Sequence, residues 1–145
     1  MILLDTNVVS EPLRLAGDPA VLRWIDAQNI ETLYLAAISL AELRFRVAAL
    51  PTGKRKDTLH TSLERRVLPL FAGRILSFDS AASVAYAELR ARARAEGKAI
   101  AVADGYIAAT AAANGLIVAT RDTAPFVSAG LVVINPWATV HSMER

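Results

Sequence analysis

Residues 1–12 read MILLDTNVVSEP, and this stretch decides the fold. The apolar run at 2–4 is typical of a short buried strand, and it leads directly into the carboxylate of Asp5. A carboxylate in that place is partly removed from water, which is unfavourable unless it has a partner. In α/β sheets, ligands bind beyond the carboxyl ends of the parallel strands. Asp5 is therefore the first candidate for a functional residue.

The rest of the chain alternates short apolar runs with segments of helical spacing. Continuous apolar strands separated by helices are typical of a parallel sheet covered on both faces. The sequence therefore predicts the α/β fold class, a three-layer sandwich with a central, mostly parallel sheet, in a single domain over residues 1–145. The expected strands after the first one are 32–37, 74–78, 116–120 and 131–135, and the expected helices are 17–28 (capped by Asp18, with Pro19 first), 39–50, 56–71, 79–97 and 101–115.

The amino-acid composition excludes several kinds of catalytic and metal-binding site. The chain is 54% hydrophobic, and its lack of cysteine excludes disulfides, zinc–thiolate sites and cysteine nucleophiles. Its two histidines are His60 and His141, and the second lies in an expected tail, which argues against a histidine-rich metal site. No apolar run approaches the ~18 residues of a membrane helix. Met1 leads into the first strand without a charged leader, so we expect a cytoplasmic protein with no membrane partner.

Basic residues are unevenly distributed, although the net charge is only +2. Such clusters can attract polyanions, but they are also typical of solvated helix faces. The residues that we single out as candidates for binding a polyanion, such as a nucleic acid, are Lys54, Arg55, Lys56, Arg90, Arg94 and Lys98.

Three further carboxylates occupy positions equivalent to that of Asp5. Asp122 lies just past the expected strand 116–120. Glu42 is expected in the first turn of the helix after 32–37, and Asp104 in the first turn of the helix before 116–120. Strand ends and helix starts meet at one edge of an α/β sheet, so we expect these four acids to converge there.

Each acid also has a purely structural explanation. Ser39 and Glu42 match a capping box, in which Glu42 accepts from backbone donors. Asp104 suits the dipole of a helix N-terminus, and Asp122 suits a turn cap. Asp5 is the hardest to explain in this way, and the four positions together favour a site.

A site of four carboxylates has a definite chemistry. The carboxylates repel one another, and their pKa values rise unless a cation is present. Oxygen ligands without histidine or cysteine favour Mg²⁺ or Mn²⁺ over zinc. Such a site can polarise a phosphodiester, activate a water and stabilise the leaving oxygen. The basic clusters would then hold the backbone of a nucleic acid.

At these residues the sequence resembles the PIN-domain ribonucleases, specifically the VapC/FitB-type toxins of bacterial toxin–antitoxin pairs. An isolated LLDTN would be a weak signal, whereas the ordered set of motifs is specific. The matching stretches are MILLDTNVVSEPLR (1–14), AAISLAELRFRV (36–47), RILSFD (74–79), ADGYIAATAAANGLIVATRDTAPF (103–126) and INPW (134–137).

The resemblance implies a role for named positions. The acidic quartet of the family, expected to be catalytic and to bind the metal, falls on Asp5, Glu42, Asp104 and Asp122. Thr6, Asn7 and Thr120 resemble the supporting shell that orients such carboxylates.

The resemblance also implies an activity and a set of partners. The activity is endonucleolytic cleavage of RNA that depends on Mg²⁺ or Mn²⁺. The implied partners are a second copy of the chain, in a homodimer, and a cognate antitoxin of the ribbon-helix-helix type. Operator DNA would be bound only through the antitoxin.

Two alternatives stay open at this point. A haloacid-dehalogenase-like phosphatase also begins with a strand that ends in aspartate, but its motif needs a second aspartate where this chain has Asn7. A non-catalytic PIN-fold module that binds RNA or an antitoxin is the other alternative. Metal dependence separates it from the nuclease.

Overall fold

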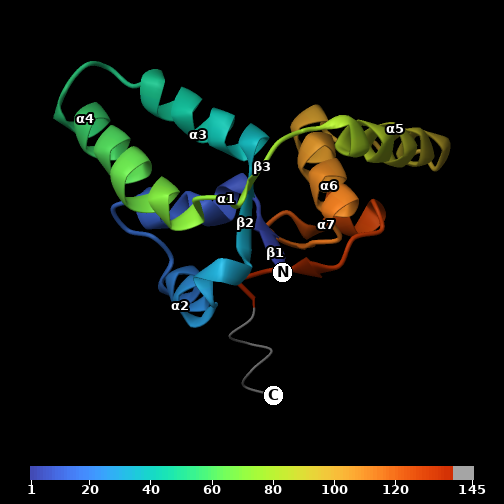
Figure 1. The fold of residues 1–145 in the computed structure, drawn as a ribbon, viewed down its shortest axis with the longest axis horizontal. Coiled ribbons are helices and arrows are strands. Elements are labelled where there is room, and N and C mark those ends of the chain that lie inside the picture. Colours follow the sequence, from blue (N-terminus) through green and yellow to red (C-terminus); the bar gives the residue numbers. More distant parts are fainter. Residues whose placement is uncertain (139–145) are drawn as a thin grey trace.

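The computed structural model describes residues 1–138, and the expected tail that contains His141 lies outside them. Its centre is a parallel sheet in the order β3-β2-β1-β4-β5 (Figure 1). Leu4, at the end of the central strand, pairs with Leu35 on one side and with Ala119 on the other. The predicted parallel α/β sheet is confirmed. The strands are β1 (Ile2–Leu4), β2 (Leu33–Ala36), β3 (Ile75–Leu76), β4 (Ile117–Ala119) and β5 (Val133–Ile134).

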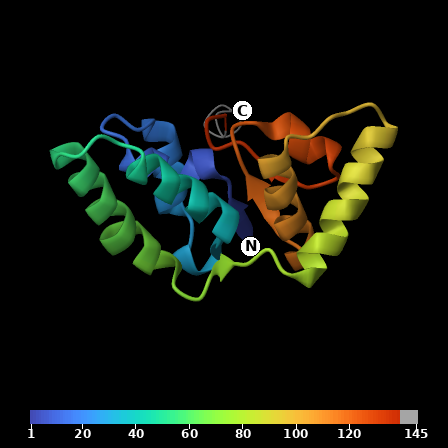
Figure 2. The ribbon, with the colours of Figure 1, turned by 90° about the horizontal axis from the view of Figure 1, so that it is seen from above.

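Helices cover both faces of this sheet (Figures 1 and 2). Within residues 1–138, no helix is long and apolar enough to cross a membrane. The helical elements are α1 (Thr6–Val9), η1 (Glu11–Leu13), α2 (Pro19–Ala27), η2 (Ile30–Thr32), α3 (Ala37–Ala48), α4 (Lys54–Thr61), η3 (Ser62–Val67), η4 (Leu68–Phe71), α5 (Ser80–Ala95), α6 (Val102–Asn114) and α7 (Thr123–Ser128).

The core consists of two apolar clusters, one on each face of the sheet. Leu4 belongs to the cluster beneath α1 to α4, and Leu3 belongs to the cluster beneath α5 to α7. This division follows from the two-residue side-chain period of a strand. Leu43 of α3 and Ile107 of α6 belong to different clusters. The sheet is thus the layer that joins the two halves.

Several helix ends lie where the sequence predicts them. The carboxylate of Asp18 accepts from the N–H of Ala20 at 2.9 Å, and Pro19 is the first residue of α2. Asp79 caps α5 in the same way, by accepting from the N–H of Ala82 at 2.9 Å. Gly115 ends α6 with φ +65°, a left-handed conformation that favours glycine.

The predicted start of α3 is wrong by two residues. α3 begins at Ala37, directly after β2, and no side chain caps it. The position of β2 is set by the pairing of Ala36 with Leu76, so the chain enters the helix before Ser39 is reached. The hydroxyl of Ser39 is buried and caps nothing. The capping box is therefore wrong, and Glu42 lies in the second turn of α3 instead of the first.

The segment predicted as one helix at 56–71 changes its hydrogen bonding along its length. It starts as α4, continues as the π-helix η3 and ends as the 3₁₀-helix η4, which has Pro69 near its start. Arg44 of α3 binds Glu64 of η3 through two hydrogen bonds, of 2.7 and 3.0 Å. This bidentate ion pair fixes the segment against α3.

A buried acid that the sequence analysis did not single out shapes the loop before α2. Glu11 is only 3% exposed, and its carboxylate accepts from the backbone N–H of Asp18 at 2.7 Å and from Arg14 at 2.9 Å. A Cβ at Gly17 would lie 2.6 Å from the carbonyl oxygen of Glu11. The loop 14–18 can therefore close over Glu11 because residue 17 has no side chain.

The role of Glu11 gives a prediction about stability. Glu11→Ala should lower the free energy of unfolding by about 1–3 kcal/mol, because it leaves the N–H of Asp18 without its acceptor. Glu31→Ala, at an exposed carboxylate, should change it by less than about 0.5 kcal/mol. Urea denaturation measures both variants, and equal losses would contradict a structural role for Glu11.

Candidate active site

Asp5 lies at the carboxyl end of the central strand and is 5% exposed. Its backbone N–H donates to the carbonyl oxygen of Ala119 at 2.9 Å, which extends the pairing of β1 with β4. One carboxylate oxygen accepts from the N–H of Thr6, and the other accepts from the hydroxyl of Thr120, both at 2.7 Å. The carboxylate of Asp5 is therefore held both by a backbone donor, from Thr6, and by a side-chain donor, from Thr120.

Thr120 connects Asp5 to the segment after β4. It is fully buried, and its hydroxyl oxygen accepts from the N–H of Asp122 at 3.1 Å and from the amide of Asn7 at 3.4 Å. The amide oxygen of Asn7 accepts in turn from the N–H of Arg121 at 3.3 Å. The structure thus brings Asn7 and Thr120 together with Asp5. Thr6 contributes its backbone N–H, whereas its buried hydroxyl has no hydrogen-bond partner within residues 1–138.

Of the other three carboxylates, two come from helices and the third lies just before a helix. Glu42 projects from the second turn of α3 and lies 3.9 Å from Arg46. Asp104 lies in the first turn of α6, as predicted. Asp122 precedes α7, but its side chain makes no capping hydrogen bond. The side chain of Asp122 therefore does not cap α7, and capping, its purely structural explanation, is not its role in this structure.

The electrostatics of Asp5 and Asp104 link the four acids. Burial raises the pKa of Asp5, the hydrogen bonds from Thr120 and Thr6 lower it, and repulsion from Asp104 and Glu42 raises it further. Burial also raises the pKa of Asp104, with repulsion from Asp122 as a second cause. Each carboxylate of the predicted quartet is thus involved in electrostatic repulsion with at least one other. The carboxyl groups of Asp5 and Asp104 therefore lose their protons less easily than they would in water.

The donor set fits a hard divalent cation by its chemistry. It offers only oxygen, and a cation would relieve the repulsion that raises the pKa values of Asp5 and Asp104. The arrangement is not a closed ligand cage. In the part of the chain that the structure describes, no three acidic or histidine side chains are grouped closely enough to hold a metal ion.

The predicted basic residues do not gather in one place. Lys54, Arg55 and Lys56 lie at the start of α4, and Arg90 and Arg94 lie in the second half of α5. Figures 1 and 2 place the start of α4 and the end of α5 at opposite ends of the molecule.

Some of the basic residues have structural partners. Lys56 donates to the carbonyl oxygen of Ala48 at 3.0 Å, at the end of α3. Arg44 is occupied by Glu64, as described above, and the guanidinium of Arg121 lies 5.2 Å from the centre of the Trp137 ring.

An aromatic cluster beside Asp104 was missed by the sequence analysis. The rings of Tyr86 and Tyr106 stack with their centres 4.7 Å apart. Phe78 and Tyr106 pack edge to face with their ring centres 5.0 Å apart. A Cβ at Gly105 would lie 3.1 Å from the ring of Tyr86, so the glycine lets α5 approach the first turn of α6. The four-residue spacing of Tyr86 and Arg90 was the available signal, since such pairs share a helix face.

Comparison with known proteins identifies the family to which this fold belongs. The PIN domain family model matches residues 2–130. The VapC ribonuclease Y4jK of Sinorhizobium fredii is 61% identical, over 94% of this chain and 98% of its own. The toxin FitB of Neisseria gonorrhoeae is 56% identical, over 94% and 99%. A solved structure of FitAB bound to an IR36 DNA fragment contains a chain with TM-score 0.91 and 53% identity, covering 94% of this chain and 96% of that one.

The family model spans most of the chain, and the relatives that match nearly its full length are more than half identical to it. The chain therefore belongs to the PIN domain family, in the group of the VapC- and FitB-type toxins.

Proposed function

We propose that the protein is an endoribonuclease, dependent on Mg²⁺ or Mn²⁺, that acts as the toxin of a toxin–antitoxin pair. The observation that carries the proposal is the buried Asp5, whose pKa is raised by burial and by neighbouring carboxylates at the edge of the sheet. Relatives that are named as a VapC ribonuclease and as the toxin FitB support it. Because the chain belongs to the PIN domain family, the haloacid-dehalogenase-like phosphatase is no longer an alternative for its function.

Asp5, Glu42, Asp104 and Asp122 are the residues that would hold the divalent cation. When bound, such a cation polarises the phosphodiester, assists the deprotonation of a water and offsets charge on the leaving oxygen. Each carboxylate oxygen of Asp5 accepts one hydrogen bond within the protein, which leaves each a further acceptor position for a ligand. The residue can therefore stay fixed while it binds.

The surrounding residues keep these carboxylates in place. The hydroxyl of Thr120 donates to Asp5 and accepts from the N–H of Asp122, so one side chain sets the positions of two acids. Asn7 ties the backbone at Arg121 to the same group. Such outer partners orient the groups that bind a metal. The basic residues of α4 and α5 supply the positive potential that attracts RNA.

The proposed partners follow the relatives. The FitAB complex bound to a DNA fragment supports a cognate antitoxin, of the ribbon-helix-helix type, through which this chain would associate with operator DNA. We further propose a homodimer that acts in the cytoplasm, where its RNA substrate is found.

The first prediction of the proposed function concerns cleavage. Protein purified without antitoxin should cut a pool of tRNA and ribosomal RNA only when Mg²⁺ or Mn²⁺ is added. Asp5→Asn should lower the rate at least about 100-fold, because the variant keeps the shape of the side chain but removes its charge. Asp26→Asn, on the exposed face of α2, should cut like the wild type.

The outcomes of this assay separate the two readings of the protein. Full activity of Asp5→Asn would refute the proposed site. If the wild type neither cuts RNA nor binds the metal, the non-catalytic PIN-fold module replaces the nuclease.

The second prediction concerns stability and pH. The usual pKa of an aspartate is 3.8, and the folded protein raises the pKa of both Asp5 and Asp104. The two carboxyl groups therefore favour the folded state while they are protonated. This contribution to the free energy of unfolding is lost as the pH rises from about 4 through their folded pKa values.

A cation that binds the ionised carboxylates should offset this loss. Saturating Mg²⁺ should raise the Tm by a few degrees at pH 7 and much less at pH 4, as measured by differential scanning calorimetry at constant ionic strength. Asp5→Asn should remove most of the increase at pH 7. An equal increase at both pH values, or an undiminished one in the variant, would show that the cation binds elsewhere.

The third prediction concerns Thr120. Thr120→Val removes the hydroxyl that donates to the ionised form of Asp5, so the pKa of Asp5 should rise further. The affinity for Mg²⁺ should fall by about 10- to 100-fold. NMR titration of the Asp5 carboxyl carbon and calorimetric titration with Mg²⁺ measure the two effects. Thr58→Val, at an exposed position of α4, should change neither quantity.

A further inference from the structure

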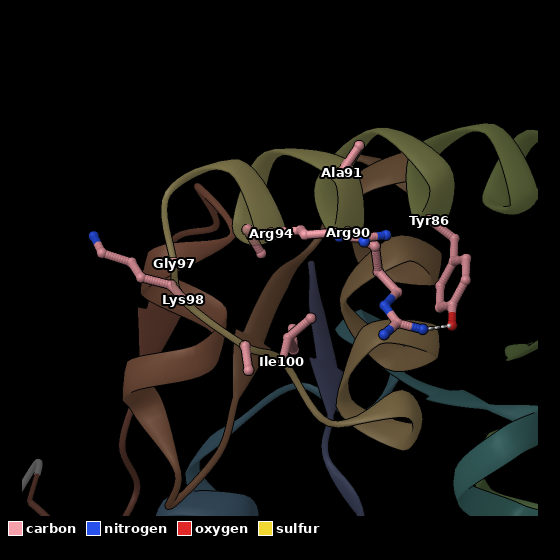
Figure 3. A pocket seen from close by; sticks show the side chains of 9 residues that line it. Tyr86, Arg90, Ala91, Arg94, Gly97, Lys98 and Ile100 are labelled. Carbon is pink, nitrogen blue, oxygen red and sulfur yellow. Dashed lines mark hydrogen bonds between the residues drawn. The ribbon is translucent and has the colours of Figure 1, made fainter.

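A pocket of about 650 Å³ lies between the second half of α5 and the segment 96–100 that leads to α6 (Figure 3). Its charged residues are all basic, and no carboxylate lines it. Within residues 1–138, none of these cations forms an ion pair. Apart from three alanines, the pocket is lined by Tyr86, Arg90, Arg94, Gly97, Lys98 and Ile100.

The guanidinium of Arg90 is held in place at one end of this pocket. It donates to the phenol oxygen of Tyr86 at 2.9 Å and lies 5.6 Å from the centre of the same ring. Tyr86 is itself fixed by stacking on Tyr106. Figure 3 shows Arg90 and Tyr86 at one end of the pocket and Lys98 at the other. The cations are therefore spread along the pocket, and one of them is oriented in advance.

The Arg90 end lies against the first turn of α6, the turn that carries Asp104. A Cβ at Gly105 would lie 3.1 Å from the ring of Tyr86 and 3.9 Å from Cδ of Arg90, so both side chains lie against the first turn of α6. Asp104 is the residue before Gly105. A ligand in the pocket would thus lead away from the carboxylates along α5.

We propose that this pocket is a subsite for backbone phosphates of the RNA strand next to the bond that is cut. The inference rests on the proposed function, since it assumes that a phosphodiester lies at the carboxylates. A guanidinium can bind phosphate through two parallel hydrogen bonds, and lysine binds it as a point charge. The volume suits a ligand of nucleotide size. The basic start of α4, at the other end of the molecule, cannot reach the same phosphates.

The test measures binding without cleavage. Fluorescence anisotropy of a labelled single-stranded RNA, with EDTA present, compares the wild type with Arg90→Gln, Arg94→Gln and Lys98→Gln. Each variant should weaken binding about tenfold at low salt. The slope of log K against log salt should fall by about 0.7 for each phosphate contact that is lost. Arg23→Gln, on the exposed face of α2, removes the same charge away from the pocket and should stay within about twofold of the wild type.

A conservative variant separates charge from shape. Arg90→Lys keeps the positive charge but removes the two-pronged donor, so it should recover the salt dependence and only part of the affinity. Equal losses in Arg23→Gln and in the pocket variants would overturn the proposal, because binding would then follow net charge alone. Unchanged binding in the pocket variants would overturn it as well.

Competition identifies the ligand. Inorganic phosphate that displaces RNA at concentrations comparable to those of RNA phosphate would show a free-phosphate site and overturn the assignment to RNA. Stronger binding of an acidic peptide, such as polyglutamate, would assign the pocket to a protein.

The cleavage assay keeps this inference separate from the proposed function. If RNA binding depends on the pocket but no divalent metal supports cleavage, the subsite stands and the proposed nuclease activity is refuted. If the pocket variants bind and cleave RNA like the wild type, the nuclease activity stands and the subsite is refuted.

Discussion

The hydrogen bond from Thr120 to Asp5 is the interaction on which the proposed site depends. It joins residues 115 positions apart in the chain, each directly after a central strand, at 2.7 Å. Asp5 is nearly buried, and its burial alone raises its pKa, so the donated hydrogen bond is needed to favour the charged form. The same hydroxyl accepts from the N–H of Asp122. The pairing of β1 with β4 therefore fixes the relative positions of Asp5, Thr120 and the backbone of Asp122.

The central strand explains why so much could be predicted from the first residues. An apolar run of three that leads into aspartate is readable as a short buried strand, and the parallel sheet then places Asp5 at the edge formed by the carboxyl ends of the strands. The cap at Asp18 and the end of α6 at Gly115 were predictable because their effects are local. The expected convergence of the acids rests on topology alone, without any knowledge of distances.

What the sequence did not predict depends on contacts between distant segments. The start of α3 is set by the pairing of Ala36 with Leu76, which overrides the local preference of Ser39 for a cap. The π-helical turn at 62–67 and the buried Glu11 likewise depend on neighbours that no local pattern reveals. Tyr86, which lines the pocket beside α5, packs over Gly105, and this is again a contact between two helices.

The division of the core into two clusters has a mechanical consequence. Glu42 is carried by a helix of one cluster and Asp104 by a helix of the other, and these two helices, α3 and α6, also contact each other directly. The separation of the two acids is therefore set by the packing of both clusters and by the contact between the two helices. A core substitution that shifts either helix changes this separation, even when it lies away from both carboxylates.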